Sequence, residues 1–181
     1  MRVLFINTVF GKGSTGRIVK QLGDAIEVVG GEYMVAYGRG EIVDKNHSYF
    51  IGSIFERYVH AGISRFTDRA GFYSKKCTEE LVFFIRKYNP DIIHLHNLHG
   101  YYINLPVLFG YLKNEYKGKI IWTLHDCWAF TGHCTHFTFA KCEKWKTGCS
   151  HCPEKNNYPS SMVTDNSRLN YEQKKTLFTV L

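Results

Sequence analysis

The sequence predicts an α/β fold in which helices cover both faces of a parallel β-sheet, and three observations lead to that prediction. Short apolar runs rich in β-branched residues recur through residues 1–125, as expected of strands buried on both faces. Segments with helical periodicity separate these runs, and such alternation favours a parallel sheet. Residues 127–160 depart from the pattern, because they are rich in Cys, His, Lys and aromatic residues and show little periodicity.

The start of the chain predicts a β-α-β unit. We expect a strand over Val3–Thr8 and a loop over residues 10–16, which are rich in Gly, Lys and Ser. Apolar residues then repeat at helical spacing until Gly30 and Gly31, where glycine ends the helix. A second strand follows over Tyr33–Tyr37. The helical stripe consists of Ile18, Val19, Leu22, Ala25, Ile26 and Val29.

The alternation continues through the middle of the chain. A short strand is expected at Tyr49–Ile51 and a helix over Ile54–Phe66. Thr78 suits the N-cap of the next helix, which Asn89-Pro90 ends because a residue before proline avoids the helical conformation. One stripe of the Ile54–Phe66 helix consists of Phe55, Tyr58, Val59 and Ile63. The remaining elements are a strand over Asp91–Leu95, a helix over Asn104–Tyr116 and a strand over Ile120–Leu124.

The length of 181 residues suits one domain, and a hydrophobic content of 44% is enough for a core. We interpret residues 1–181 as a single Rossmann-like domain that contains the irregular segment 127–160 as an insertion. The chain stops in Thr176–Leu181, which resembles a strand barely begun. The domain is therefore expected to be incomplete.

Composition also restricts location and partners. No apolar run reaches the roughly 20 residues of a membrane-spanning helix, and no signal-peptide cleavage site follows the apolar start. We therefore expect a cytoplasmic protein whose six cysteines are thiols or metal ligands rather than disulfides. The net charge of +7 suits an ordinary soluble surface, or attraction to phosphates or an anionic membrane face. Because the basic residues form no dense block, nucleic acid is not an expected partner.

The segment Gly11–Gly16 matches the pattern G-x-G-x-x-G between a strand and a helix. Such glycines let the backbone approach a ligand, and the helix N-terminus offers N–H groups to an anion, although a plain tight turn gives the same pattern. A nicotinamide dinucleotide site needs an acidic residue at the end of the second strand. This chain has Arg39 there, which disfavours that cofactor unless it carries a 2′-phosphate, but the loop still suits a phosphate.

Further polar residues follow later strands, at the edge where parallel sheets bind ligands. His125 and Asp126 come directly after the last strand. A histidine there can donate to a phosphate or a sugar hydroxyl, transfer a proton, or simply cap the strand. His94, His96 and His99 form H-x-H-x-x-H with no carboxylate at ligand spacing. We interpret them as one histidine packed in the strand and two that line the cleft.

The irregular segment contains four cysteines with the spacing C-x7-C-x6-C-x2-C. The last pair has the two-residue gap that lets two thiolates bind one tetrahedral zinc ion. Four protein ligands would leave no position for water, so the zinc would be structural, and free thiols are the alternative. The expected ligands are Cys134, Cys142, Cys149 and Cys152, with His133, His136 and His151 as substitutes. Cys77 and Cys127 lie outside this spacing and are interpreted as ordinary buried thiols.

Three stretches of the chain carry a family resemblance. They run from Asp91 to Tyr102, from Thr123 to Cys134 and from Lys141 to Pro153. Together they resemble bacterial family-4 glycosyltransferases of the subgroup associated with capsular polysaccharide, exopolysaccharide or lipopolysaccharide assembly. The run from Leu-His-Asp-Cys-Trp to Cys-x-x-Cys-Pro is specific to this resemblance, whereas the glycine loop is not.

The resemblance implies a GT-B fold, in which two Rossmann-like domains face a cleft. The N-terminal domain chiefly binds the acceptor and the C-terminal domain binds the nucleotide sugar, and transfer retains anomeric configuration without a catalytic metal. This chain would be the acceptor-side domain, with a saccharide or lipid-linked saccharide as acceptor and peripheral contact with the inner face of the membrane. The donor domain with its E-x7-E motif is not in the chain, so the chain alone is expected to be inactive.

The resemblance also implies roles for individual residues. His125 would contact the transferred sugar, and Asp126 would stand beside it in the cleft as its catalytic neighbour. The loop residues Gly13, Ser14 and Gly16 would approach the donor diphosphate or the acceptor. The acceptor side would be lined by His96, Asn97 and Tyr101.

A function from another class fits the same sequence. A zinc-stapled module without catalysis could bind an anionic glycan, a lipid headgroup or nucleic acid through its basic charge and the aromatic residues Phe137 and Trp145. The two functions can be distinguished by whether the gene continues past Leu181 into a second Rossmann-like domain with paired glutamates, as only the glycosyltransferase requires.

Overall fold

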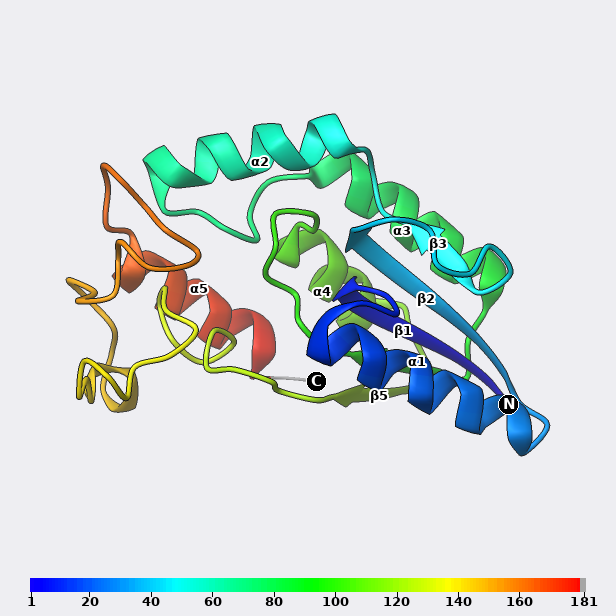
Figure 1. Ribbon diagram of the computed structural model, residues 1–181. Coiled ribbons are helices and arrows are strands. Elements are labelled where there is room, and N and C mark those ends of the chain that lie inside the picture. The colour runs from blue at the N-terminus through cyan, green and yellow to red at the C-terminus, as the bar shows by residue number, and fades with distance from the viewer. Residues whose placement is uncertain (180–181) are drawn as a thin grey trace.

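The computed structural model describes residues 1–179 and contains one sheet of five parallel strands (Figure 1). The strands lie in the order β3-β2-β1-β4-β5, and every neighbouring pair is parallel. This confirms the predicted α/β fold with a parallel, Rossmann-like sheet. The strands are β1 (Arg2–Val9), β2 (Glu32–Arg39), β3 (Ser48–Phe50), β4 (Ile92–Leu95) and β5 (Lys119–Trp122).

Alternate side chains of β1 pack into two separate cores. Leu4 and Ile6 belong to the core formed with helices α3 (Lys75–Tyr88) and α4 (Leu105–Asn114). Val3 and Phe5 belong to the core formed with α1 (Gly13–Val28) on the opposite face. Helices therefore cover both faces, as predicted, and α5 (Ser167–Phe178) packs beside α4. Complete burial of a side chain such as Leu4 stabilises the fold by about 1.5–3 kcal/mol.

The strand order fixes where a ligand can bind. The chain moves from β1 outward to β2 and β3, and then returns to the other side of β1 for β4 and β5. The direction of winding thus reverses between β1 and β4. Open α/β sheets bind ligands outside the carboxyl ends of the strands at such a reversal.

Helix α2 (Ile54–Thr67) is present as predicted, but its apolar stripe faces solvent. The helix begins with a capping box between Ser53 and Glu56. Its buried residues are His60 and Ser64. The stripe residues Phe55, Tyr58, Val59 and Ile63 are exposed by 75%, 66%, 43% and 41%. In α1, the stripe residues Ile18, Leu22 and Val29 are likewise exposed.

Two predictions about individual elements were wrong, and the first concerns the start of a helix. Helix α3 starts at Lys75 with Ser74 as its N-cap, whereas Thr78 is buried inside the helix. The Thr78 hydroxyl donates to the carbonyl of Ser74 (2.9 Å) and accepts the backbone N–H of Asn104 (2.8 Å), so it joins α3 to the start of α4.

The second error concerns the end of the chain. Residues 176–178 belong to α5 and are not the start of a strand, while residues 180 and 181 lie outside the described part. Between β5 and α5 the only regular element among the described residues is a 3-10 turn at Lys144–Lys146. None of the helices described in residues 1–179 has both the length and the apolar character needed to cross a membrane.

Candidate functional site

The loops that follow β1 and β4 are tied together at the carboxyl edge of the sheet. The Thr8 hydroxyl lies 2.6 Å from the carbonyl oxygen of His99 and 3.1 Å from that of Asn97. The backbone N–H of Asn97 donates to the side-chain oxygen of Asn7 (3.3 Å). These bonds fix the turn after β4 next to the end of β1, where the direction of winding reverses.

His96 and His125 form a pair at this edge. The Nδ1 atom of His96 lies 2.8 Å from Nε2 of His125, and the rings are stacked. Burial, with the charges of His94 and His125, lowers the pKa of His96 to about 3. Burial also lowers the pKa of His125, although Asp126 opposes the effect. Both imidazoles are therefore neutral near pH 7.

A second linked group contains Asp126 and His99. Asp126 Oδ2 lies 2.6 Å from His99 Nε2, and Oδ1 accepts the backbone N–H of Trp128 (2.9 Å). The other ring nitrogen of His99 lies 3.2 Å from the Tyr158 hydroxyl. Burial raises the pKa of Asp126, but the hydrogen bond and charge of His99 outweigh it, so the pKa is lowered. Asp126 is therefore an ionised carboxylate that orients His99.

The glycine loop divides into an exposed part and a buried part. Gly13 has a φ of +66°, which favours glycine, and it opens α1 together with the exposed Ser14. Gly16 is buried, and a Cβ there would lie 3.1 Å from the Val9 side chain. Gly16 therefore lets α1 pack closely on β1, whereas Gly13 and Ser14 can meet an anion at the helix N-terminus.

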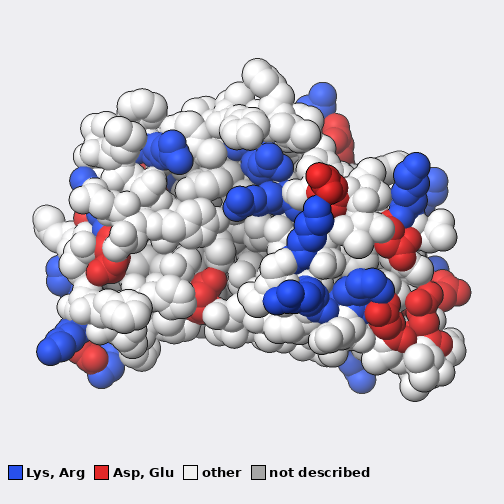
Figure 2. Space-filling model, in the orientation of Figure 1, with Lys and Arg blue, Asp and Glu red and all other residues white. Residues whose placement is uncertain are grey.

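Three arginines border a hollow of about 470 Å³ that we call the arginine hollow. Arg39 comes from the end of β2, and Arg57 and Arg65 come from α2. Figure 2 shows basic side chains gathered in the middle of this face of the molecule. Among residues 1–179, no carboxylate forms a salt bridge with any of the three.

Two tyrosines complete the arginine hollow. Tyr101 and Tyr158 line it, and burial raises the pKa of both phenols, with Arg65 opposing the shift at Tyr101 and Arg39 at Tyr158. Sequence reasoning placed Tyr101 on the acceptor side and Arg39 at the end of the second strand, but it did not predict that Arg57 and Arg65 join them. The available signal was Arg57 and Arg65 on one helical face, with Ala61 between them.

The structure brings most of the predicted residues to one edge. His96, Asn97 and Tyr101 follow β4, His125 and Asp126 follow β5, and the glycine loop follows β1. His94 stays in β4, where its Nε2 lies 2.8 Å from the Thr123 hydroxyl oxygen. His96 and His99 are more deeply buried than we expected of residues that line a cleft.

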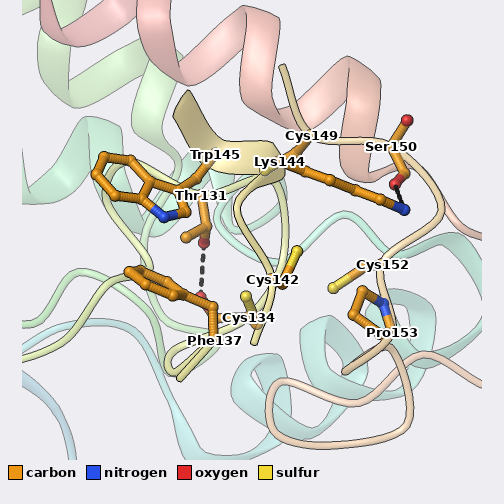
Figure 3. A pocket seen from close by; sticks show the side chains of 10 residues that line it. All are labelled: Thr131, Cys134, Phe137, Cys142, Lys144, Trp145, Cys149, Ser150, Cys152 and Pro153. Carbon is orange, nitrogen blue, oxygen red and sulfur yellow. Dashed lines mark hydrogen bonds between the residues drawn. The ribbon is translucent and has the colours of Figure 1, made fainter. Parts of the chain in front are cut away.

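The four predicted zinc ligands also lie together, away from that edge. Cys134, Cys142, Cys149 and Cys152 are free thiols that line one small hollow, which we call the cysteine hollow (Figure 3). A hydrogen bond from Cys152 lowers the pKa of Cys134 to about 6, against the effect of burial, and correspondingly raises the pKa of Cys152. Cys77 lies on α3, and Cys127 is only partly buried.

A buried polar group anchors the irregular segment to the helices. His133 Nδ1 bonds with Asp68, the left-handed C-cap of α2, and both side chains are almost fully buried. Lys174 of α5 donates to the carbonyl of Trp128 (2.6 Å) and lies 4.0 Å from the centre of the Trp128 ring. Burial lowers the pKa of Lys174 to about 7. Sequence reasoning missed this anchor, because its partners are far apart in the chain.

Comparison with known proteins gives one informative similarity. No protein-family model matches the chain. Over 78 residues the chain is 44% identical to the provisionally named colanic acid biosynthesis glycosyl transferase WcaC of Escherichia coli (strain K12). The aligned part spans 41% of this chain and 19% of the WcaC protein. The similarity supports a glycosyltransferase of the exopolysaccharide type and does not favour the non-catalytic binding module.

Proposed function

We propose that the chain is the acceptor-side, N-terminal part of a retaining GT-B glycosyltransferase that assembles cell-surface polysaccharide from a nucleotide sugar. The observation that carries the proposal is the 44% identity to WcaC over 78 residues. The site geometry agrees, because polar side chains converge at the carboxyl edge of the sheet where the winding reverses. Donor binding falls to a second domain, and the transfer itself uses no metal.

In this proposal His125 meets the transferred sugar. Its ring is held by His96 and is neutral near pH 7, so it can donate one hydrogen bond to a sugar hydroxyl. Asp126 acts through His99, which it orients. Gly13 and Ser14 offer backbone N–H groups to a phosphate, and Asn97, in the turn after β4, lines the acceptor side.

The arginine hollow suits the anionic part of the acceptor. Three guanidinium groups without carboxylate partners among the described residues favour a phosphate or diphosphate, which Arg binds through paired hydrogen bonds. The exposed apolar stripe of α2 lies on the helix that supplies two of these arginines. We therefore propose a lipid-linked saccharide as acceptor, reached from the inner face of a membrane on which the protein sits peripherally.

A transfer assay tests the proposed function. Because the chain alone is expected to be inactive, it would be expressed together with the donor-binding domain. Membranes from these cells would be supplied with radiolabelled nucleotide sugars, and label in lipid-extractable saccharide would be counted. Replacement His125→Ala should abolish the incorporation, whereas His47→Ala, at the opposite edge of the sheet, should leave it intact. Equal incorporation by wild type and His125→Ala would refute the role of His125, and no incorporation from any nucleotide sugar would refute the function.

A further inference from the structure

The cysteine hollow has the size of a single atom. Its volume is about 10 Å³. A volume of that order holds one water-sized particle and no cluster of atoms. Cysteines from four separate positions of one irregular segment line it, and Figure 3 shows the sulfur atoms of Cys134, Cys142 and Cys152 turned toward the same space.

We propose that Cys134, Cys142, Cys149 and Cys152 bind one structural zinc ion. Zinc prefers thiolate sulfur in a tetrahedral arrangement, with Zn–S distances of about 2.3 Å. Four protein ligands complete that arrangement, so no position is left for water or substrate. The site takes no direct part in the proposed sugar transfer, because its ligands lie in the irregular segment and not with His125 and the glycine loop at the carboxyl edge of the sheet.

In the structure the four cysteine side chains are not arranged around a single metal position. Within residues 1–179, no three Cys, His, Asp or Glu side chains stand in position to hold a metal ion. Instead, Cys134 and Cys152 remain free thiols, placed so that one can donate a hydrogen bond to the other. One rotatable bond, χ1, moves the sulfur of a cysteine. Closure on zinc therefore needs rotation of the sulfurs and loss of their protons.

The charges around the cysteine hollow suit a zinc–thiolate centre. One Zn²⁺ with four thiolates carries a net charge of −2, and the turn between Cys134 and Cys149 contains three lysines, Lys141, Lys144 and Lys146, against one carboxylate, Glu143, which pairs with Lys146. The Lys144 ammonium group donates to the carbonyls of Ser150 (2.9 Å) and His151 (3.0 Å). It thus joins the turn that carries Cys142 to the turn that carries the last two cysteines.

Regular secondary structure contributes little to the support of the part of the segment that carries the four cysteines. Its regular structure is a single 3-10 turn, and its aromatic packing centres on Phe137 stacked on Trp145 with the ring centres 5.2 Å apart. Structural zinc supplies folding free energy to segments of this kind. The same segment carries Tyr158, which contacts His99 at the sheet edge. A zinc ion would therefore hold Tyr158 in place.

Metal analysis of the 181-residue chain tests the proposal. Protein purified without chelator should contain about one zinc per chain. Cobalt exchanged for zinc should give the thiolate charge-transfer band and the visible bands of tetrahedral cobalt. Cys142→Ser and Cys149→Ser should each lose most of the metal, whereas the matched control Cys77→Ala, on α3, should keep it.

Measurements on the wild-type protein test the zinc site even if a cysteine variant does not fold. Four thiols should become reactive toward an alkylating reagent only after a strong chelator removes the zinc. Wild-type protein without zinc, an octahedral cobalt spectrum, or two disulfides found by mass spectrometry would each overturn the proposal. Zinc retained at one per chain in Cys149→Ser would overturn the assigned ligand set.

Discussion

The imidazole of His96 lies 2.8 Å, from Nδ1 to Nε2, from the imidazole of His125, so one proton joins two rings across the carboxyl edge of the sheet. The other nitrogen of His96, Nε2, is buried and has no hydrogen-bond partner within the described chain. A buried N–H without a partner is costlier than a bare ring nitrogen. His96 should therefore carry its proton on Nδ1 and donate it to His125.

This relationship predicts the tautomers of both rings. Near pH 7, nitrogen-15 spectra should show His96 protonated on Nδ1 only, and His125 protonated on Nδ1 with Nε2 as acceptor. His125 then presents Nδ1–H as the donor for a ligand oxygen. A signal from an Nε2-protonated His96 would contradict the assignment. In His96→Phe the His125 ring should lose its fixed tautomer and show exchange between both forms.

Acid should destabilise the protein through two buried histidines. Burial lowers the pKa of His60 to about 3, and that of His96 is also lowered to about 3, from 6.5. Below pH 6.5 the unfolded chain takes up protons that the folded chain refuses until about pH 3. The free energy of unfolding should therefore fall as the pH drops through this window, by up to about 1.4 kcal/mol per pH unit for each histidine.

Urea unfolding at several pH values measures this effect. His60→Gln should be less sensitive to acid than wild type by about 1.4 kcal/mol per pH unit between roughly pH 6 and pH 4. Gln at this position can still bond with the Ser74 hydroxyl, which lies 2.7 Å from His60 Nδ1. The exposed His136, replaced in the same way, serves as the control. An unchanged pH dependence in His60→Gln would show that His60 is not buried in its neutral form.

Local sequence patterns predicted the sheet well, because their causes are local. Apolar runs such as Val3–Thr8 form strands wherever both faces are buried, and Asn89-Pro90 ends a helix through the geometry of proline itself. Once the strands were known, the shared edge of His96 and His125 followed from the parallel topology.

The failures have non-local causes. Helix α5 was missed because its buried face is polar and does not form an apolar stripe. Asn170 donates to the carbonyl of Asp68 at the end of α2, Lys174 donates to that of Trp128 in the loop after β5, and the Ser167 hydroxyl donates to the Asp165 carboxylate. The apolar stripe of α2 was predicted correctly from its helical spacing. The spacing alone does not show whether such a stripe packs against a core or faces solvent, and here it faces solvent. The arginine hollow needs β2 and α2 to be adjacent, which no local pattern reveals.

Two helical glycines should respond in opposite directions to alanine. In α1, a Cβ at Gly23 would lie 2.4 Å from Cε2 of the buried Tyr33, so Gly23→Ala should lower the free energy of unfolding by about 1–3 kcal/mol. In α4, a Cβ at Gly110 meets nothing within 4 Å. Gly110→Ala should raise the free energy of unfolding by roughly 0.8–1 kcal/mol, because alanine favours the helix more than glycine does. Urea unfolding of the two variants checks the pair, and the same sign for both would contradict the packing of Tyr33 on α1.

The solvent-facing stripe of α2 should bind anionic membranes. Phe55 and Phe66 are 75% and 58% exposed, on the helix that supplies Arg57 and Arg65 to the arginine hollow. Insertion of one phenylalanine ring into the interface contributes about 1.5–3 kcal/mol, so Phe55→Ser and Phe66→Ser should each weaken binding to phosphatidylglycerol vesicles about tenfold or more. Arg57→Gln should weaken it by about 1 kcal/mol and reduce its dependence on salt.

Phe83 of α3 provides the matched control. It is 68% exposed, but it lies on a different helix, beside the acidic residues Glu79 and Glu80. Phe83→Ser removes the same ring from the surface and should leave sedimentation with vesicles unchanged. An equal loss in Phe83→Ser would mean that exposed aromatic residues bind the vesicles without regard to place. Wild-type protein that stays in the supernatant would refute membrane contact through α2, while the roles proposed for His125 and the cysteine hollow would stand.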